Sequence, residues 1–155
     1  MKKINISRVL IFLIIFYFLP QKVMALSTQD SKFIYSKLCF GATPNDLRKN
    51  KYVNYDSLID NLIDNTNEKA INKEPEWVNE SFDQQKDKSK VLDLKIWWYK
   101  EMITTNSPFT ERMTLFWHNL FTSGIKKVKS PILMYQQNVL LRKYALGNFK
   151  DFLHS

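Results

Sequence analysis

Two segments of the chain carry polar side chains in a pattern that could support chemistry, and the first surrounds a histidine. The run 111–121 (ERMTLFWHNLF) contains Glu111, Arg112, His118 and Asn119. An imidazole can act as a general base, as a metal ligand or as a structural hydrogen-bonding group. A metal site on one helix needs a second ligand about four residues away, and Thr114 and Thr122 are not usual ligands. We therefore predict no metal and no other cofactor, and a structural histidine is the simpler interpretation.

The second segment places Asn138 and Arg142 four residues apart, which puts them on one face of a helix. If that helix is buried, the guanidinium needs a carboxylate, backbone carbonyls or a bound anion, because an unpaired buried charge is costly. Glu111 is the partner that the motif suggests, and a polar clamp between two helices is then the simpler interpretation. If the chain is instead an enzyme, the catalytic candidates are His118, Arg142 and Arg112, with Glu111, Asn119 and Asn138 as binding residues.

The elements that must position these residues are helices. Thr43-Pro44, Ser107-Pro108 and Ser130-Pro131 each place a capping hydroxyl before a proline, which is favoured at the first position of a helix. The three glycines, Gly41, Gly124 and Gly147, each follow an apolar run, where we expect left-handed helix ends. The predicted helices span 30–40, 44–49, 54–64, 86–105, 108–123 and 131–146, with a last helix starting at Asn148. Residues 65–82 should be a surface loop anchored by Trp77 or Phe82.

The faces of two helices have consequences for the fold. On helix 108–123 the apolar residues form one stripe, with Glu111 and His118 opposite to it and Arg112 and Asn119 on a flank. Helix 131–146 is apolar around its whole circumference, so it should be central and enclosed. Trp97, Trp98 and Trp117 should belong to the core, with Trp97 as the one that could face the polar side and bind a sugar.

These patterns predict an all-α fold, an irregular helical bundle without useful strand patterns. Because helix 131–146 needs more neighbours than the chain supplies, we expect residues 27–155 to be a partial helical domain, the N-terminal part of a larger one, truncated at its C-terminus. A compact small bundle with a short last helix is the alternative. The lone Cys39 excludes an internal disulfide and should be a small buried hydrophobe.

Residues 1–26 have the layout of a secretory signal peptide. Basic residues precede the eleven apolar residues 9–19, Pro20 follows them, and small residues flank a cleavage site near Ala25. Eleven helical residues span about 16 Å, roughly half of the ~30 Å hydrocarbon core, so a membrane-spanning helix is disfavoured, with an uncleaved signal anchor as the alternative. We expect an exported protein of the periplasm or cell envelope, which touches the membrane only through this segment.

The charge balance argues against nucleic acid as a partner. The chain has 23 basic and 15 acidic residues, and four of the basic residues lie in residues 1–25 with no acid. The remaining net charge is +4, and acids and bases alternate through residues 83–95. Such mixing is typical of a solvated helix face rather than a groove that follows phosphates. No phosphate-binding glycine loop, G-x-S-x-G, H-E-x-x-H or dinucleotide motif is present.

The runs ERMTLFWHNLF (111–121) and LMYQQNVLLRKYALGNFKDFL (133–153), with CFGATPNDL (39–47), resemble the large bacterial family of domain of unknown function 1800. The resemblance implies an exported, mainly helical protein of several hundred residues, and it implies no particular reaction. It covers Arg112, His118, Asn119, Asn138 and Arg142 as motif positions. Leu120, Gln136 and Tyr144 depart from the family pattern, which often has His, Arg and His there.

The sequence therefore leaves three functions open. The first is an exported envelope protein that binds a partner protein or an envelope polymer, or has a structural role. The second is a hydrolase acting on an envelope substrate, with His118 as general base and Arg142 as anion binder. The third is an inactive truncated remnant. Convergence of His118, Arg112, Asn138 and Arg142 on one open cleft would favour the enzyme.

Overall fold

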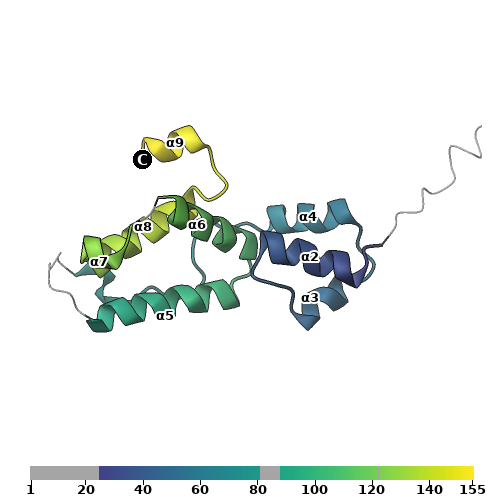
Figure 1. The fold of residues 1–155 in the computed structure, drawn as a ribbon, viewed down its shortest axis with the longest axis horizontal. Helices are drawn as coiled ribbons and strands as arrows, with labels where there is room; N and C mark the ends of the chain where they lie inside the picture. Colours follow the sequence, from purple (N-terminus) through teal and green to yellow (C-terminus); the bar gives the residue numbers. More distant parts are fainter. Residues whose placement is uncertain (1–24, 81–87, 122) are drawn as a thin grey trace, which may run out of the picture.

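The computed structural model describes residues 25–80, 88–121 and 123–155, and within them the chain is all-α, without a strand. The helices fall into two lobes, with a short last helix projecting from the second (Figure 1). The first lobe holds α2 (Thr28–Leu38), α3 (Pro44–Lys49) and α4 (Tyr55–Asp64). The second holds a 3₁₀ turn η1 (Glu76–Asn79), α5 (Lys88–Thr104), α6 (Pro108–Leu120), α7 (Ile125–Val128) and α8 (Pro131–Lys143), followed by α9 (Phe149–Leu153).

Side-chain caps fix most helix starts, as the sequence indicates. Thr43 and Asp46 form a reciprocal capping box at α3, and Ser130 caps α8 through the Leu133 amide. Asn148 caps α9. Ser107 is the exception: its hydroxyl donates 2.5 Å to the Asn65 carbonyl oxygen, so the predicted cap of α6 is wrong.

The expected glycine helix ends are correct at one position of three. Gly41 has a φ of +123°, which disfavours any residue with a Cβ. Gly124 instead precedes α7 in an extended conformation, and Gly147 has no positive φ. The left-handed conformation belongs instead to Lys129, after α7, a helix that the sequence did not predict. The expected helix 108–123 ends earlier, at Leu120.

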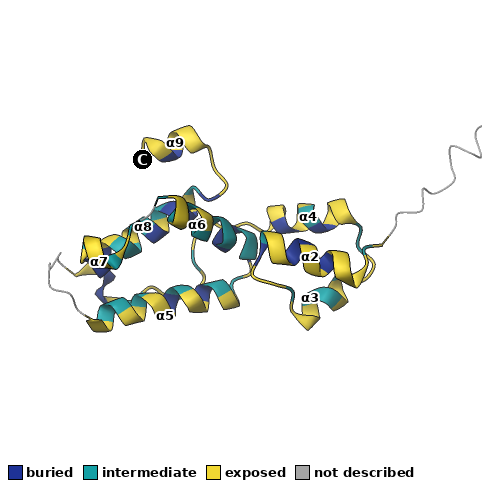
Figure 2. Cartoon of the chain, in the orientation of Figure 1, coloured by how far each residue is buried: buried dark blue, intermediate teal, exposed yellow. Residues whose placement is uncertain are grey.

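Each lobe has its own small core (Figure 2). In the first, α2 packs on α4 through Ile34, Tyr35, Cys39, Leu58 and Leu62. In the second, Trp77 and Val78 of η1 pack on Ile132 of α8, which confirms Trp77 as the anchor of its loop. Phe82 lies outside the described residues. Cys39 is 1% exposed, as expected for a small buried hydrophobe.

Helix α6 is rotated away from the orientation that the sequence predicts, so its apolar stripe is not the most buried face. Thr110, Glu111 and Thr114 are buried, whereas Phe116 and Leu120 of the apolar stripe are more than half exposed. The reason is that Glu111 has buried partners on α5 and α8, which fixes the rotation of the helix. The end of the stripe packs instead on α9, where the rings of Trp117 and Phe149 stack with centroids 5.6 Å apart.

Helix α8 is covered on one side only by the described residues. Ile132, Asn138, Leu141 and Arg142 are buried, while Leu133 and Val139 are 42% and 40% exposed. The expected complete enclosure is therefore absent from the described part of the chain. No helix in that part is long and apolar enough to cross a bilayer. The predicted signal peptide, residues 1–26, lies outside the described part except for its last two residues.

Candidate functional site

A buried ion pair joins the two helices that carry the sequence motifs. Arg142 of α8 donates from Nε to Glu111 Oε1 (2.5 Å) and from Nη2 to Oε2 (3.1 Å). Both residues are at most 2% exposed, and this two-point geometry is the strongest form of a guanidinium–carboxylate contact. The sequence-based pairing of Arg142 with Glu111 and the polar clamp are thus confirmed.

Two tryptophans of α5 complete this clamp. The Trp98 indole N–H donates to Glu111 Oε2 (3.1 Å). The Arg142 guanidinium lies 5.3 Å from the centroid of the Trp97 ring, a cation–π arrangement. Trp97 is 6% exposed, so the idea that it faces the polar side to bind a sugar is wrong. Glu111, Arg142, Trp97 and Trp98 are hereafter called the clamp.

A second buried carboxylate ties the loop after α4 to α5. Glu101 is fully buried and accepts hydrogen bonds from the backbone N–H groups of Ile71 (2.8 Å) and Asn72 (2.9 Å). The Asn72 side chain adds a third bond to it (2.6 Å). With the bond from Ser107 to the Asn65 carbonyl, these contacts fix the first lobe to the second.

The remaining sequence candidates do not converge on one cleft. The Arg112 guanidinium lies 5.8 Å from the Phe40 ring centroid, beside the first lobe. Asn119 is exposed. His118 meets Trp98 edge to face at 5.1 Å, and burial lowers the pKa of its imidazole. No group of three His, Cys, Asp or Glu side chains in the described ranges could hold a metal ion.

His118 and Asn138 do share one cavity, here called the inner cavity. It lies between α5, α6 and α8 and has a volume of about 450 Å³. Its wall is mostly apolar, from residues such as Leu94, Trp98, Leu115, Ile125 and Met134. The four groups expected in a catalytic cleft are therefore divided. His118 and Asn138 line the inner cavity, Arg142 belongs to the clamp with Glu111, and Arg112 lies beside the first lobe.

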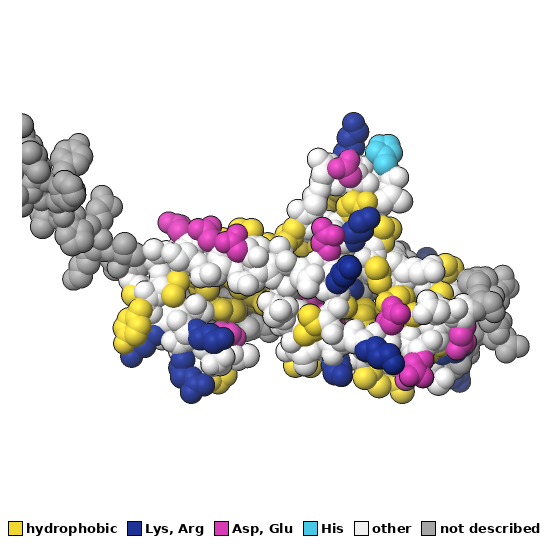
Figure 3. Space-filling model, turned by 180° about the vertical axis from the view of Figure 1, so that it is seen from behind, with side chains coloured by type: hydrophobic (Ala, Val, Ile, Leu, Met, Phe, Trp, Pro, Cys, Tyr) yellow, Lys and Arg dark blue, Asp and Glu magenta, His cyan; other side chains and the backbone are white. Residues whose placement is uncertain are grey.

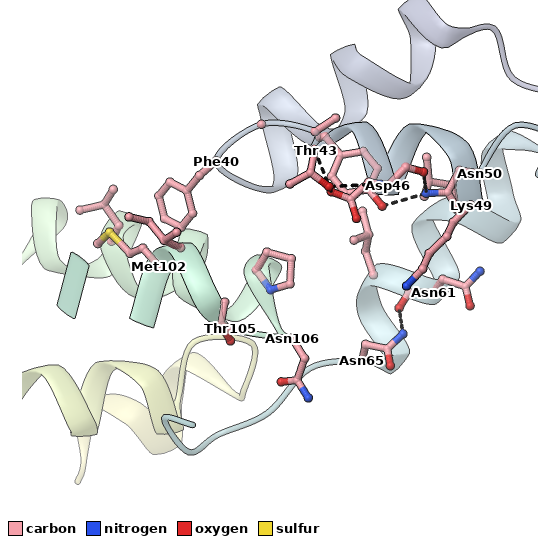
Figure 4. Close-up of a pocket in the computed structure, with 18 of the residues that line it drawn as sticks. Phe40, Thr43, Asp46, Lys49, Asn50, Asn61, Asn65, Met102, Thr105 and Asn106 are labelled. Carbon is pink, nitrogen blue, oxygen red and sulfur yellow. Dashed lines mark hydrogen bonds between the residues drawn. The ribbon is translucent and has the colours of Figure 1, made fainter. Parts of the chain in front are cut away.

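A larger hollow, here called the inter-lobe groove, runs between the lobes with a volume of about 1090 Å³. Figure 4 shows apolar side chains at one end, including Phe40 and Met102, and polar side chains from α3 and α4 at the other. The labelled polar residues are Thr43, Asp46, Lys49, Asn50, Asn61, Asn65, Thr105 and Asn106. Tyr99, Met102 and Leu115 line both the groove and the inner cavity.

The amides of the groove differ in how far they are engaged. Asn50 donates to the Tyr35 hydroxyl oxygen (2.9 Å), and Asn65 donates to the Asn61 carbonyl oxygen (2.6 Å). The side chains of Asn61 and Asn106 are exposed and have no hydrogen-bond partner within the described ranges. Burial, and second the negative charge of Asp46, raises the pKa of Tyr35, which keeps its hydroxyl neutral.

The comparison with protein families gives a match over residues 34–155 to the family described as Protein of unknown function (DUF1800). The chain belongs to this family. Neither the curated proteins nor the solved structures contain a match to the chain.

In this DUF1800 protein the departures from the family pattern lie away from the groove and the inner cavity. Leu120 is 57% exposed and lines neither. Tyr144 stacks on Phe152 of α9, with centroids 5.5 Å apart.

Sequence reasoning missed Glu101 and most of the groove in this DUF1800 protein. Glu101 follows Trp97 by four residues, so a correct assignment of the Trp97 face as buried would have revealed a buried carboxylate. The groove residues Phe40, Asn61 and Asn106 come from three separate loops and helices. No sequence spacing connects them.

Proposed function

We propose that this DUF1800 protein is an exported binding protein of the cell envelope, and that its inter-lobe groove binds a polar glycan. The observation that carries the proposal is the groove itself, which is lined by aromatic and apolar side chains at one end and by amides and other polar side chains at the other (Figure 4). Sugar rings present hydroxyl groups at their edges and C–H groups on their faces. Asn61 and Asn106 offer donors and acceptors to the former, and Phe40 and Tyr99 offer flat apolar surface to the latter.

The charges near the groove favour a ligand without strong net charge. Asp46 and Lys49 both line it, and they have opposite sign. Figure 3 shows acidic and basic side chains over the same face of the molecule, without one continuous basic patch. This distribution supports a glycan rather than a nucleic acid, whose binding depends on clustered basic residues.

The structure of the clamp supports a binding role over a hydrolase. Glu111 and Arg142 bind each other and Trp98, so their charges hold helices together. His118 faces the aromatic ring of Trp98 and lines the inner cavity without a neighbouring carboxylate there. A general base is commonly oriented by a carboxylate, and the described lining of this cavity contains no Asp or Glu.

The test is titration calorimetry of the purified chain with a tetramer of N-acetylglucosamine and with soluble cell-wall glycan fragments. We expect saturable binding that Phe40→Ala and Asn106→Ala weaken by about three- to tenfold each, since each removes one contact of ~1 kcal/mol. The matched controls are Phe33→Ala, an exposed ring on α2, and Asn119→Ala, an exposed amide on α6. Absence of binding, or equal losses in the controls, would refute the proposal.

A further inference from the structure

Asn138 presents a buried amide without a partner. It is 4% exposed, and neither its Oδ1 nor its Nδ2 atom has a hydrogen-bond partner among the described residues. A buried amide that forms no hydrogen bond destabilises the fold, so such groups are rare and need an explanation. Asn138 lines the inner cavity, so its amide lies directly behind the cavity wall, and a rotation of the side chain would bring it to a molecule bound there.

The inner cavity has the size and composition of a small-molecule site. Its volume of about 450 Å³ falls within the ~300–1,000 Å³ range of ligand pockets, and such pockets combine apolar walls with few polar groups. Trp98, Leu115 and Met134 supply apolar surface. Ser123 also lines it, but its hydroxyl already contacts Gln137 and the sulfur of Met134.

The cavity wall favours a neutral ligand. The nearest buried charges, on Glu111 and Arg142, bind each other and do not line the cavity. The charged side chain in the wall is Lys95, which is exposed at the rim. His118 is kept in its neutral form by burial. A charged ligand would therefore lose its hydration without gaining a buried counter-ion.

We propose that the inner cavity binds a small neutral molecule with an apolar, preferably aromatic, body and an amide-like edge that pairs with Asn138. The free Oδ1 accepts one hydrogen bond and the free Nδ2 donates another, so the best partner presents an N–H and a C=O side by side, as a carboxamide or lactam does. The apolar body lies against Trp98, Leu115 and Met134. Asn138, Trp98 and Met134 do not line the inter-lobe groove, whereas Tyr99 and Leu115 line both hollows.

The experiment is an NMR titration of the isotope-labelled chain with naphthalene-2-carboxamide, which has both amide functions. Its methyl ester counterpart, methyl naphthalene-2-carboxylate, has the same rings and carbonyl but no N–H donor. For the carboxamide we expect saturable shifts of the Asn138 side-chain amide and of residues lining the cavity. The ester should bind about three- to tenfold more weakly, because one hydrogen bond is lost.

Variants distinguish pairing with Asn138 from simple apolar binding. Asn138→Leu should weaken carboxamide binding about five- to tenfold and remove the preference over the ester. Asn119→Leu, the same change at an exposed site on α6, should leave both affinities unchanged. Met134→Phe narrows the cavity without touching the amide and should weaken both probes alike. Each variant is compared at a temperature where its melting curve shows it folded.

Any of three results would overturn the proposal. The first is absence of saturable binding of the carboxamide to the wild-type chain up to its solubility limit. The second is equal affinity of the wild-type chain for carboxamide and ester. The third is an Asn138→Leu variant that binds the carboxamide as well as the wild type does. Loss of glycan binding has no bearing on these results, because the probes are measured without glycan and the variants lie outside the groove contacts.

Discussion

Removing one member of the Glu111–Arg142 pair should destabilise the fold far more than removing a surface pair. Both side chains are at most 2% exposed and share two hydrogen bonds of 2.5 and 3.1 Å. Glu111→Gln leaves the Arg142 charge buried without compensation, and the cost of breaking such a pair is about 3–5 kcal/mol. A native protein is stable by only about 5–15 kcal/mol, so the loss is a large fraction of the total.

The double variant separates the cost of an orphaned charge from the contribution of the pair. Glu111→Leu with Arg142→Leu removes both charges, so no charge is left buried alone, and a hydrophobic replacement of a buried pair is often neutral. We therefore expect the double variant to be more stable than Glu111→Gln by about 2 kcal/mol or more. The assay is urea unfolding followed by far-UV circular dichroism, with the free energy of unfolding extrapolated to water.

The matched control is the exposed ion pair of Lys73 and Glu76, 3.5 Å apart with side chains 82% and 90% exposed. Lys73→Met should lower the free energy of unfolding by less than about 0.5 kcal/mol, because exposed pairs contribute little. A Glu111→Gln loss no larger than that of this control would refute the reasoning, as would a double variant no more stable than Glu111→Gln.

Three further predictions concern other buried groups. Asn138→Leu should raise the free energy of unfolding by about 1–2 kcal/mol in the same urea assay, because it removes an amide without a described partner. Burial, and second the charge of Asp46, raises the pKa of the Cys39 thiol to about 11, so at pH 8 it should react with a disulfide reagent much more slowly than the thiol of the urea-unfolded chain. Burial lowers the pKa of His118 below its usual ~6.5, so the fold favours the neutral imidazole. The stability that the neutral imidazole contributes is therefore present above pH ~6.5 and is lost as the pH falls through the folded-state pKa. The loss of stability between pH 7.5 and 5 should then be smaller in His118→Gln than in the wild type, whereas equal losses would contradict this assignment.

The positions of the helices can be predicted from local sequence signals, whereas the contacts between helices can be predicted only in part. Thr43 and Ser130 cap helices where the sequence predicts, because a cap depends on residues within one turn. The pairing of Arg142 with Glu111 could be inferred because a buried charge has few ways to be compensated. The rotation of α6 could not be inferred from the sequence. The periodicity of its apolar stripe indicates one buried face, whereas the partners that fix Glu111 in the interior lie on other helices.

The candidate site was less accessible to sequence reasoning than the fold. Of the motif residues, Glu111 and Arg142 pair with each other in the clamp, whereas His118 and Asn138 line the inner cavity. The groove depends on how two lobes meet, which is fixed by contacts such as that between Glu101 and the backbone of Ile71 and Asn72. Residues 30 positions apart that meet in this way leave no periodic signal in the chain.

Hydrogen–deuterium exchange of the chain with and without soluble cell-wall glycan fragments tests the central proposal most directly. The account predicts slower exchange in the segments that line the inter-lobe groove, namely 40–50, 58–65 and 99–108. Exchange in α9 should stay unchanged. Protection confined to α8 and α9, or no protection at saturating glycan, would contradict a glycan site between the lobes.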